Sequence, residues 1–279
     1  MSQIINTNLA SLNAQRNLTT SQAALSQSIQ RLSSGLRVNS SKDDAAGLAI
    51  AERMNAQIRG MNVAIRNAND AISLAQVADG ALGQISDLAQ RMRELAVQAN
   101  NATNGTSDRA NLNTEYQQLA AELTRTIGGT TFNGQAILAG QAGTQTYQIG
   151  AGTTVNDTID ITTTDMSADP TVTTVVASSV ATAGTGGAQD AINAIDGMLD
   201  VINTQRATYG AAQNRFSSVI ATLQVSAENQ TAARSRIMDA DFAAETASMT
   251  RAQVLQQAGQ AMLAQANQLP AGVLTLLKG

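Results

Sequence analysis

Apolar residues spaced seven apart run inward from both ends of this chain and stop at a central stretch rich in Thr and Gly. On the C-terminal side this spacing is kept by Ile195, Ile202, Tyr209, Phe216 and Leu223, and again by Leu255, Met262 and Leu269. On the N-terminal side, Leu18, Leu25, Ile29, Leu32 and Leu36 are separated by steps of seven, four, three and four. A stripe this narrow needs another helix to bury it. The pattern predicts helices packed lengthwise and directs the search for function to assembly.

The composition excludes most catalytic chemistry. Apolar residues make up 43% of the 279 residues, but aromatic residues only 2%, which favours helix packing through Ala, Leu, Ile and Met. The chain has neither Cys nor His, so disulfides, thiolate metal sites, His general bases and His-based zinc motifs are all absent. We interpret five acids as capping residues at helix starts, where negative charge is favoured by the helix dipole: Asp43, Asp44, Asp239, Asp241 and Glu245. We therefore expect no enzyme activity, no cofactor and no metal.

Charge and hydropathy limit the partners. Residues 1–42 carry four bases and no acid, whereas residues 126–205 carry seven Asp and no Lys or Arg. The bases are scattered and lack neighbouring aromatics, so nucleic-acid binding is not expected. The first residues lack a basic region followed by an apolar one, as a signal peptide would have, and no apolar run approaches the roughly 18 residues of a membrane helix. We expect no membrane insertion, and either a cytoplasmic location or export without a cleaved leader.

Two helices are predicted in the first hundred residues. The first covers residues 7–34 and stops at Gly35. The second is expected to begin at a Ser cap, Ser40 or Ser41, with Asp43 and Asp44 in its first turn. It continues to the Asn-rich break at residues 100–105.

The remaining elements return the chain on itself. A third helix, capped by Thr106 or Ser107, ends at residues 128–129, a fourth covers 188–237 and a last one covers 241–269. Between them, residues 146–149 and 153–162 read as a β-hairpin, and residues 171–180 as either a strand or a loop. The predicted fold class is mainly α: a long antiparallel helical bundle or coiled coil with a small β-hairpin region in the middle. The terminal arms hold too few large apolar residues to be stable alone, so we hypothesise that neighbouring copies order them.

Several segments resemble one family closely. These are Leu32–Gly47, Gln90–Gln98, Phe132–Gly134, Ser235–Phe242, Arg251–Gly259 and Val273–Leu277. They are similar to the matching segments of bacterial flagellin, and the resemblance covers roughly residues 1–140 and 188–279. Only about sixty residues stand where some flagellins carry large outer domains, so the chain looks like a short form of the family.

The resemblance implies a structural subunit that self-assembles into the flagellar filament for swimming motility. It implies an inner filament-core domain from residues 1–42 and 239–279, and an outer helical domain from residues 43–187 and 188–238. The implied location is extracellular, and the implied partners are further copies of the chain, an export chaperone, the type III export apparatus, the filament cap, hook-associated proteins and a Toll-like receptor. Two alternatives stay open: a hook–filament junction protein and, from another class, a membrane-active helical toxin.

The candidate site residues fall into four groups. The expected polymerisation core is Leu25, Ile29, Leu32, Leu36, Leu255, Met262 and Leu269. The expected outer-domain packing residues are Ile58, Ile65, Ile72, Ile195, Ile202, Phe216 and Leu223. By resemblance, the Toll-like receptor candidates are Gln90, Arg91, Leu95 and Glu115, and the candidates for cytosolic innate sensors are Leu274, Leu276 and Leu277.

Overall fold

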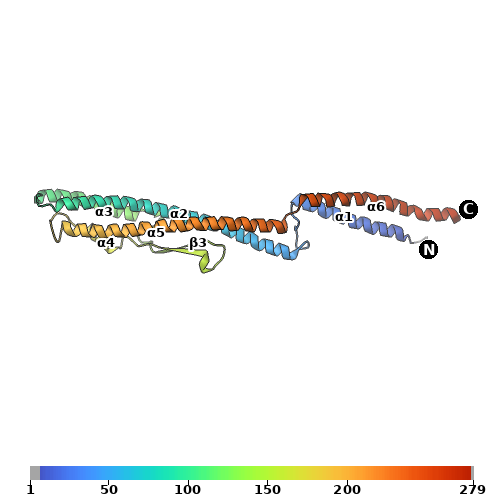
Figure 1. The fold of residues 1–279 in the computed structure, drawn as a ribbon, viewed down its shortest axis with the longest axis horizontal. Coiled ribbons are helices and arrows are strands. Elements are labelled where there is room, and N and C mark those ends of the chain that lie inside the picture. Colours follow the sequence, from blue (N-terminus) through green and yellow to red (C-terminus); the bar gives the residue numbers. More distant parts are fainter. Residues whose placement is uncertain (1–6, 278–279) are drawn as a thin grey trace. The chain divides into compact units, whose positions relative to one another are not determined.

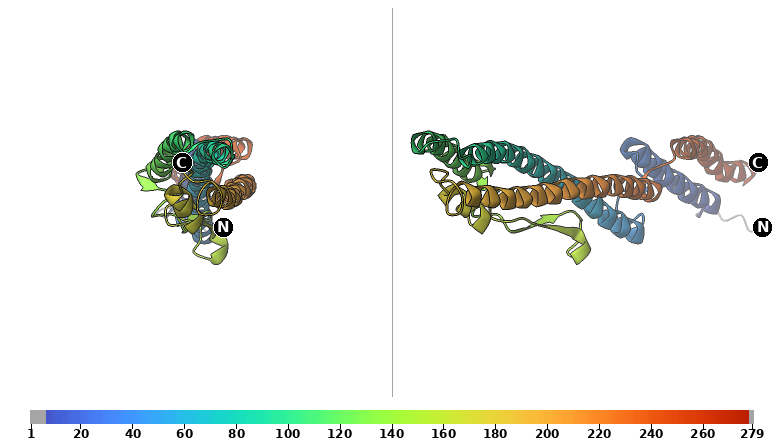
Figure 2. Two further views of the ribbon diagram at one scale, coloured as in Figure 1. Left: turned by 90° about the vertical axis from the view of Figure 1, so that its left-hand side faces the viewer. Right: turned by 60° about the vertical axis from the view of Figure 1, so that its left-hand side comes forward.

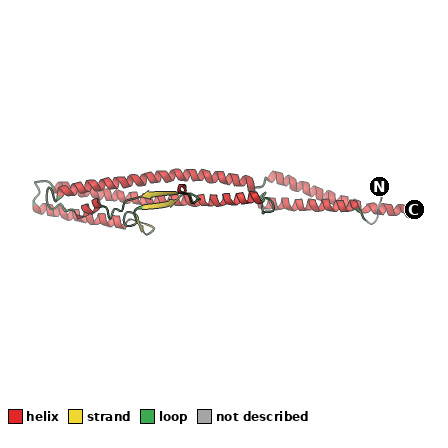
Figure 3. Cartoon of the chain, turned by 90° about the horizontal axis from the view of Figure 1, so that it is seen from below, coloured by secondary structure: helices red, strands yellow, loops and turns green. Residues whose placement is uncertain are grey.

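The chain is mainly helical and divides into two units. The computed structural model describes residues 7–277, with side chains up to residue 268. Unit 1 comprises residues 1–56 and 229–279, and unit 2 comprises residues 57–228. Figure 1 labels the elements and Figure 3 shows that helices dominate over a few short strands. In order they are α1 (Leu9–Ser34), α2 (Ala45–Ala99), α3 (Thr106–Gly129), β1 (Thr131–Phe132), β2 (Gln135–Ala136), β3 (Thr144–Gln148), η1 (Val155–Asp157), β4 (Thr158–Thr162), α4 (Pro170–Ala177), α5 (Ala188–Met238) and α6 (Phe242–Leu277).

The ends of α1 follow from local chemistry. The Asn8 side chain caps the helix by accepting a hydrogen bond from the Ser11 N–H at 3.1 Å. At the other end Gly35 has φ +71°, a left-handed conformation that glycine adopts without a Cβ clash, and its N–H donates to the Arg31 carbonyl. The predicted stop at Gly35 is confirmed.

The predicted start of α2 is wrong. The helix begins at Ala45, and its cap is Asp44, whose carboxylate accepts from the Gly47 N–H at 2.8 Å. The serines are not caps, because the Asp43 carboxylate holds the preceding turn by accepting from the backbone N–H and the hydroxyl of Ser40. The hydroxyl hydrogen bond is the largest cause that lowers the pKa of Asp43. Both carboxylates therefore precede the helix.

A small core in unit 1 holds the links between long helices. Val38, Ala51 and Met238 are buried together. Backbone hydrogen bonds join the α1–α2 link to the break between α5 and α6: the Arg37 N–H donates to the Met238 carbonyl at 2.6 Å, and the Ala240 N–H to the Gly35 carbonyl at 2.9 Å. This core fixes how the chain enters α2 and leaves α5.

In unit 2, α2 and α5 are antiparallel, as predicted. Arg93 of α2 pairs with Asp196 of α5 at 2.7 Å, while Asp79, earlier on α2, pairs with Arg206, later on α5, at 2.8 Å. Figures 1 and 2 show α3 alongside α2. Together these helices enclose the largest buried apolar cluster, which confirms the predicted fold class.

The start of α3 also differs from the prediction. The residue before the helix is Gly105, and neither Thr106 nor Ser107 caps it. Instead the Asp108 carboxylate reaches back and accepts from the Gly105 N–H at 3.1 Å. The predicted end of α3 at residue 129 is confirmed.

The predicted hairpin exists, with a shorter second strand. β3 pairs antiparallel with β4, which begins at Thr158 rather than at residue 153. Ile149, Ile159 and Ile161 pack against Ala68 of α2 and Phe216 of α5. The Phe216 ring meets Tyr147 of β3 edge-on, with ring centroids 5.5 Å apart. The hairpin is therefore a layer laid on the long helices of unit 2.

Residues 170–177 form a helix, α4, so both readings of the stretch 171–180, strand and loop, are wrong for residues 171–177, and only residues 178–180 lack regular structure as the loop reading expected. The Asp169 side chain caps the helix by accepting from the Thr171 N–H at 2.8 Å, and Pro170 occupies the first helical position. The buried Tyr116 hydroxyl of α3 donates to the Val175 carbonyl at 3.0 Å. These local and tertiary hydrogen bonds override the strand preference of the Thr- and Val-rich sequence.

Among the residues that the structure describes, none of the helices combines the length and apolar character needed to cross a membrane. Within the same residues, no three acidic side chains are grouped closely enough to hold a metal ion.

Candidate self-assembly surface

The two terminal helices, α1 and α6, pack antiparallel through small residues. The side chains buried along them are Ser11, Ser28, Ala252 and Ala266. The Ser11 hydroxyl donates to the Asn267 side-chain oxygen at 2.9 Å, and the Asn8 amide donates to the Ala266 carbonyl at 2.7 Å. Small side chains allow two helices to approach closely, but they bury little apolar area.

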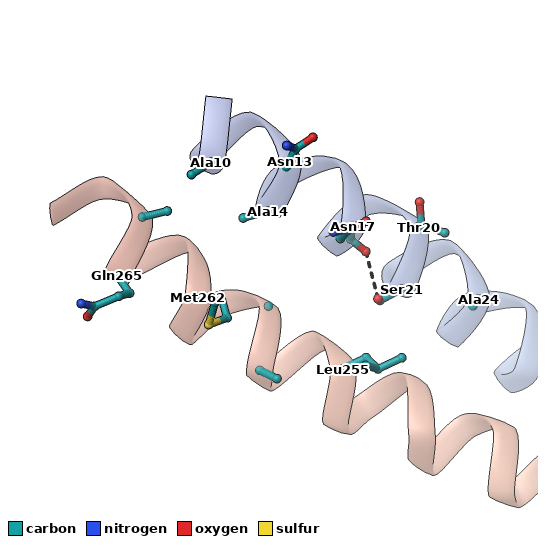
Figure 4. Close-up of a pocket in the computed structure, with 13 residues that line it drawn as sticks. Ala10, Asn13, Ala14, Asn17, Thr20, Ser21, Ala24, Leu255, Met262 and Gln265 are labelled. Carbon is teal, nitrogen blue, oxygen red and sulfur yellow. Dashed lines mark hydrogen bonds between the residues drawn. The ribbon is translucent and has the colours of Figure 1, made fainter. Parts of the chain in front are cut away.

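A groove of about 790 Å³ runs between the same two helices. Figure 4 shows its two walls, with α1 on one side and α6 on the other. Alanines and short polar side chains make up most of the wall on α1, and Leu255 and Met262 stand on the α6 wall. The groove is thus lined mainly by small and apolar side chains, and a groove of this kind can accept side chains from another helix.

Large apolar side chains remain exposed on both helices. On α1 they are Leu9 (63% exposed), Leu12 and Ile29, and on α6 they are Phe242, Val254, Leu255 and Met262 (64% exposed). Scattered exposed apolar residues are ordinary, but here they lie along one helix pair that also carries an apolar groove. Such a surface is typical of a protein–protein interface.

The predicted polymerisation core is divided between these environments. Ile29, Leu255 and Met262 are exposed, whereas Leu25 and Leu32 are half-buried. Leu36 packs against the small unit 1 core. Leu269 lies on α6, but its side chain is outside the described residues. Seven-residue spacing therefore located α1 and α6 as helices without stating which of their side chains the single chain covers.

The predicted outer-domain packing residues all lie on α2 or α5. Ile195, Ile202 and Phe216 are fully buried in the unit 2 clusters. Ile72 packs against the cluster that holds the hairpin, and Ile58, Ile65 and Leu223 are half-buried.

Three of the four receptor candidates share one exposed surface of α2 and α3. Arg91 bonds to Glu115 at 2.7 Å and to Glu94 at 2.9 Å, and both hydrogen bonds raise the pKa of Arg91, that to Glu115 more. Gln90 is also exposed. Leu95 is only 1% exposed and belongs to the core of unit 2, so it supports this surface from beneath.

The candidates for cytosolic sensors, Leu274, Leu276 and Leu277, fall within α6, but their side chains lie outside the described residues. Their role therefore stays a prediction.

Two features of the structure escaped the sequence. The groove is lined mainly by small residues, which carry no periodic apolar signal. In unit 2, Gly60 of α2 receives the loop after β3: a Cβ on Gly60 would lie 2.5 Å from the Cβ of Ala151. A glycine inside a long predicted helix was the available signal for such a close approach.

Comparison with known proteins identifies the family. Residues 5–143 match the bacterial flagellin N-terminal helical region, and residues 192–277 match the bacterial flagellin C-terminal helical region. A flagellin of Halalkalibacterium halodurans is 47% identical over 275 residues, which span 99% of this chain and 100% of that protein.

Other relatives agree. Flagellin FlaB2 of Treponema pallidum is 41% identical over 294 residues, covering 99% of this chain and 100% of that protein. Flagellin A of Vibrio cholerae is 34% identical over 376 residues, covering 98% and 99%. A crystal structure of Bacillus cereus flagellin is 30% identical with a TM-score of 0.48, covering 57% of this chain and 88% of that one. The chain therefore belongs to the bacterial flagellin family, whose members are structural subunits of the extracellular flagellar filament and not enzymes.

Proposed function

We propose that filament growth buries the α1–α6 surface of each copy against neighbouring copies. The observation that carries the proposal is that large apolar side chains are exposed on the same two helices that form a groove lined mostly by small ones. Leu9, Leu12 and Ile29 project from α1 without lining the groove, so a contact between them and the groove of the next copy joins two different surfaces. Such a heterologous contact grows into a helical polymer when its rotation does not close a ring.

Burial of single side chains on this surface would change the affinity between copies by a measurable amount. Fully burying one Leu, Ile or Met side chain stabilises a contact by about 1.5–3 kcal/mol. Ile29, Leu255 and Met262 are each about half exposed or more in the single chain, so each has area left to bury. Since every 1.4 kcal/mol is about tenfold in an equilibrium constant, losing one such side chain changes the affinity between copies by roughly tenfold or more.

The test is polymerisation of the purified chain with substitutions on this surface. Leu255→Gln and Met262→Gln keep helix propensity and remove apolar area. We expect each to raise the critical concentration for filament growth roughly tenfold, measured by sedimentation and negative-stain microscopy. The control is Val225→Gln, since Val225 is 58% exposed on α5 but belongs to unit 2.

If both terminal variants polymerise like the wild type, or if Val225→Gln is equally impaired, the α1–α6 surface is not the main contact. The same assay addresses the alternatives left by the sequence. A hook–filament junction protein would not grow long filaments alone, and a membrane-active toxin would release the contents of lipid vesicles.

We further propose that a Toll-like receptor recognises the exposed surface around Gln90, Arg91 and Glu115. Supporting this, Arg91 and Glu115 form an exposed ion pair that presents both signs of charge. Arg91→Ala is expected to abolish receptor signalling. The matched control is Arg125→Ala, because Arg125 is also exposed and paired, with Glu122 at 2.5 Å. Equal signalling by the two variants would mean that Arg91 is not part of the recognition surface.

The remaining partners are proposed from family membership. We infer export through the type III apparatus with a chaperone that covers the exposed side of α6, followed by contact with the cap and hook-associated proteins. The filament-core domain, residues 1–42 and 239–279, would contain the proposed contact. The outer helical domain, residues 43–187 and 188–238, would carry the receptor surface.

A further inference from the structure

We infer that Met262 is a modification site: an oxidant of the peroxide class converts its thioether to a sulfoxide, and the sulfoxide weakens the assembly of that copy until it is reduced again. The inference rests on the proposed function and adds to it a reversible chemical control of the same surface. Two independent observations support it, the exposure of the Met262 side chain and its place in the groove between α1 and α6.

Peroxide chemistry on this chain is directed at methionine. The sequence contains no Cys, Trp or His, so thioethers are the side-chain groups that a mild peroxide oxidises most readily. Five of the methionines with described side chains are almost fully buried: Met61, Met92, Met166, Met198 and Met238. Met54 and Met249 are half-buried, and among the described methionines only Met262 is exposed, at 64%. Because a buried sulfur reacts only after the core around it opens, Met262 is expected to react first.

The neighbours of Met262 explain its exposure. On a helix, the residues three and four positions away lie beside a given side chain. Around Met262 these positions are held by Ala258, Gly259, Gln265 and Ala266. All but the glutamine lack atoms beyond Cβ, so they leave the thioether open to the solvent. Figure 4 shows the Met262 sulfur on α6, between Leu255 and Gln265.

Oxidation changes the polarity of this position without changing its charge. The sulfur lone pair takes one oxygen atom from the peroxide, the O–O bond breaks, and the second oxygen leaves as water. The sulfoxide oxygen is a hydrogen-bond acceptor where the thioether was apolar. The apolar side chains that the proposed contact brings to the groove offer no donor, so this oxygen would be buried without a partner.

The modification is reversible and acts before assembly. Methionine sulfoxide reductases return the thioether: two thiols are oxidised to a disulfide, and the oxygen leaves as water. In a filament the proposed contact covers the Met262 sulfur, so a peroxide reaches it only in free copies. Oxidation therefore selects which copies join the filament.

The test combines peptide mapping with the polymerisation assay. Purified monomer is treated with hydrogen peroxide, the reaction is stopped with catalase, and the chain is cut with trypsin. The tryptic peptide 252–278 carries Met262 as its only methionine, so mass spectrometry reads this position directly. We expect this peptide to gain one oxygen at least about tenfold faster than the peptides with buried methionines, and the critical concentration to rise about tenfold. Sulfoxide reductases A and B with dithiothreitol should restore both the mass and the assembly.

Two leucine variants are the matched controls. Met262→Leu keeps the apolar volume and removes the sulfur, so it should polymerise equally before and after peroxide. Met249→Leu removes a half-buried methionine of the same helix that does not line the groove, and it should stay as sensitive to peroxide as the wild type.

Wild-type assembly of a chain fully oxidised at Met262 overturns the inference, and so does an equal loss of assembly by Met262→Leu after peroxide. In either case the Leu255→Gln and Met262→Gln variants still judge the proposed function separately. If Met262 is oxidised as fast in filaments as in monomers, the groove stays open after assembly, and the proposed function itself is wrong.

Discussion

Gly60 offers a stability test with internal controls in the same helix. A Cβ added at Gly60 would lie 2.5 Å from the Ala151 Cβ and 3.0 Å from the Ala151 Cα. Carbon atoms in contact prefer about 3.5–4.0 Å, so the loop after β3 must move by about 1 Å. At Gly80, also on α2, an added Cβ meets nothing within 4 Å.

The two substitutions should therefore act in opposite directions. Gly→Ala in a helix interior gains about 0.5–1 kcal/mol from helix propensity. Gly80→Ala should show this gain, whereas Gly60→Ala also carries an overpacking term of about 1–3 kcal/mol. The free energies of unfolding should thus differ by about 1–3 kcal/mol between the variants.

Urea unfolding followed by tyrosine fluorescence measures this difference. All three tyrosines belong to unit 2, so the signal reports on the unit that contains Gly60. Adding Ala151→Gly to Gly60→Ala should recover part of the loss, because the Cβ contact disappears while that to the Ala151 Cα remains. Equal stabilisation by Gly60→Ala and Gly80→Ala would refute the seating of the loop on α2.

Three further predictions concern other parts of the chain. Burial raises the pKa of the Tyr116 hydroxyl to about 12. The contribution of the neutral Tyr116 to the free energy of unfolding is therefore complete below about pH 10, its unfolded pKa, and is lost as the pH rises towards 12. Tyr116→Phe should weaken this loss, measured by unfolding at alkaline pH. Hydrogen exchange of the soluble monomer should be faster in α1 and α6 than in α2 and α5, and strong protection of residues 9–34 would contradict ordering by neighbours. Gly35→Ala should destabilise unit 1 by about 1–2 kcal/mol, because φ at this position is +71° and an L side chain is strained there. Thermal unfolding followed by circular dichroism measures this loss, and an unchanged transition would count against the left-handed cap.

Most of the helical fold followed from local patterns. The seven-residue spacing on α5 and the break at residues 100–105 placed two long helices, and Gly35 placed the end of α1. Helix periodicity and left-handed glycine are properties of neighbouring residues, so the sequence alone specifies them. The helix starts were harder, since Asp44 and Asp108 compete with nearby Ser and Thr for the same backbone N–H groups.

α4 shows how tertiary contacts decide a segment of mixed preference. Its Val and Thr residues favour a strand, while Asp169 and Pro170 favour a helix start. The choice is settled by burial of Val172 and Val175 and by the hydrogen bond from Tyr116, which lies 59 residues away in the sequence. No local window contains that partner.

The amino-acid sequence by itself determined where the long helices lie and that apolar stripes run along both ends. Only the tertiary structure decided which of those stripes the single chain covers. Ile202 and Leu255 lie in the same kind of repeat, yet Ile202 is buried and Leu255 is 52% exposed. The physical reason is that periodicity records the face a helix offers, whereas burial depends on what lies against that face.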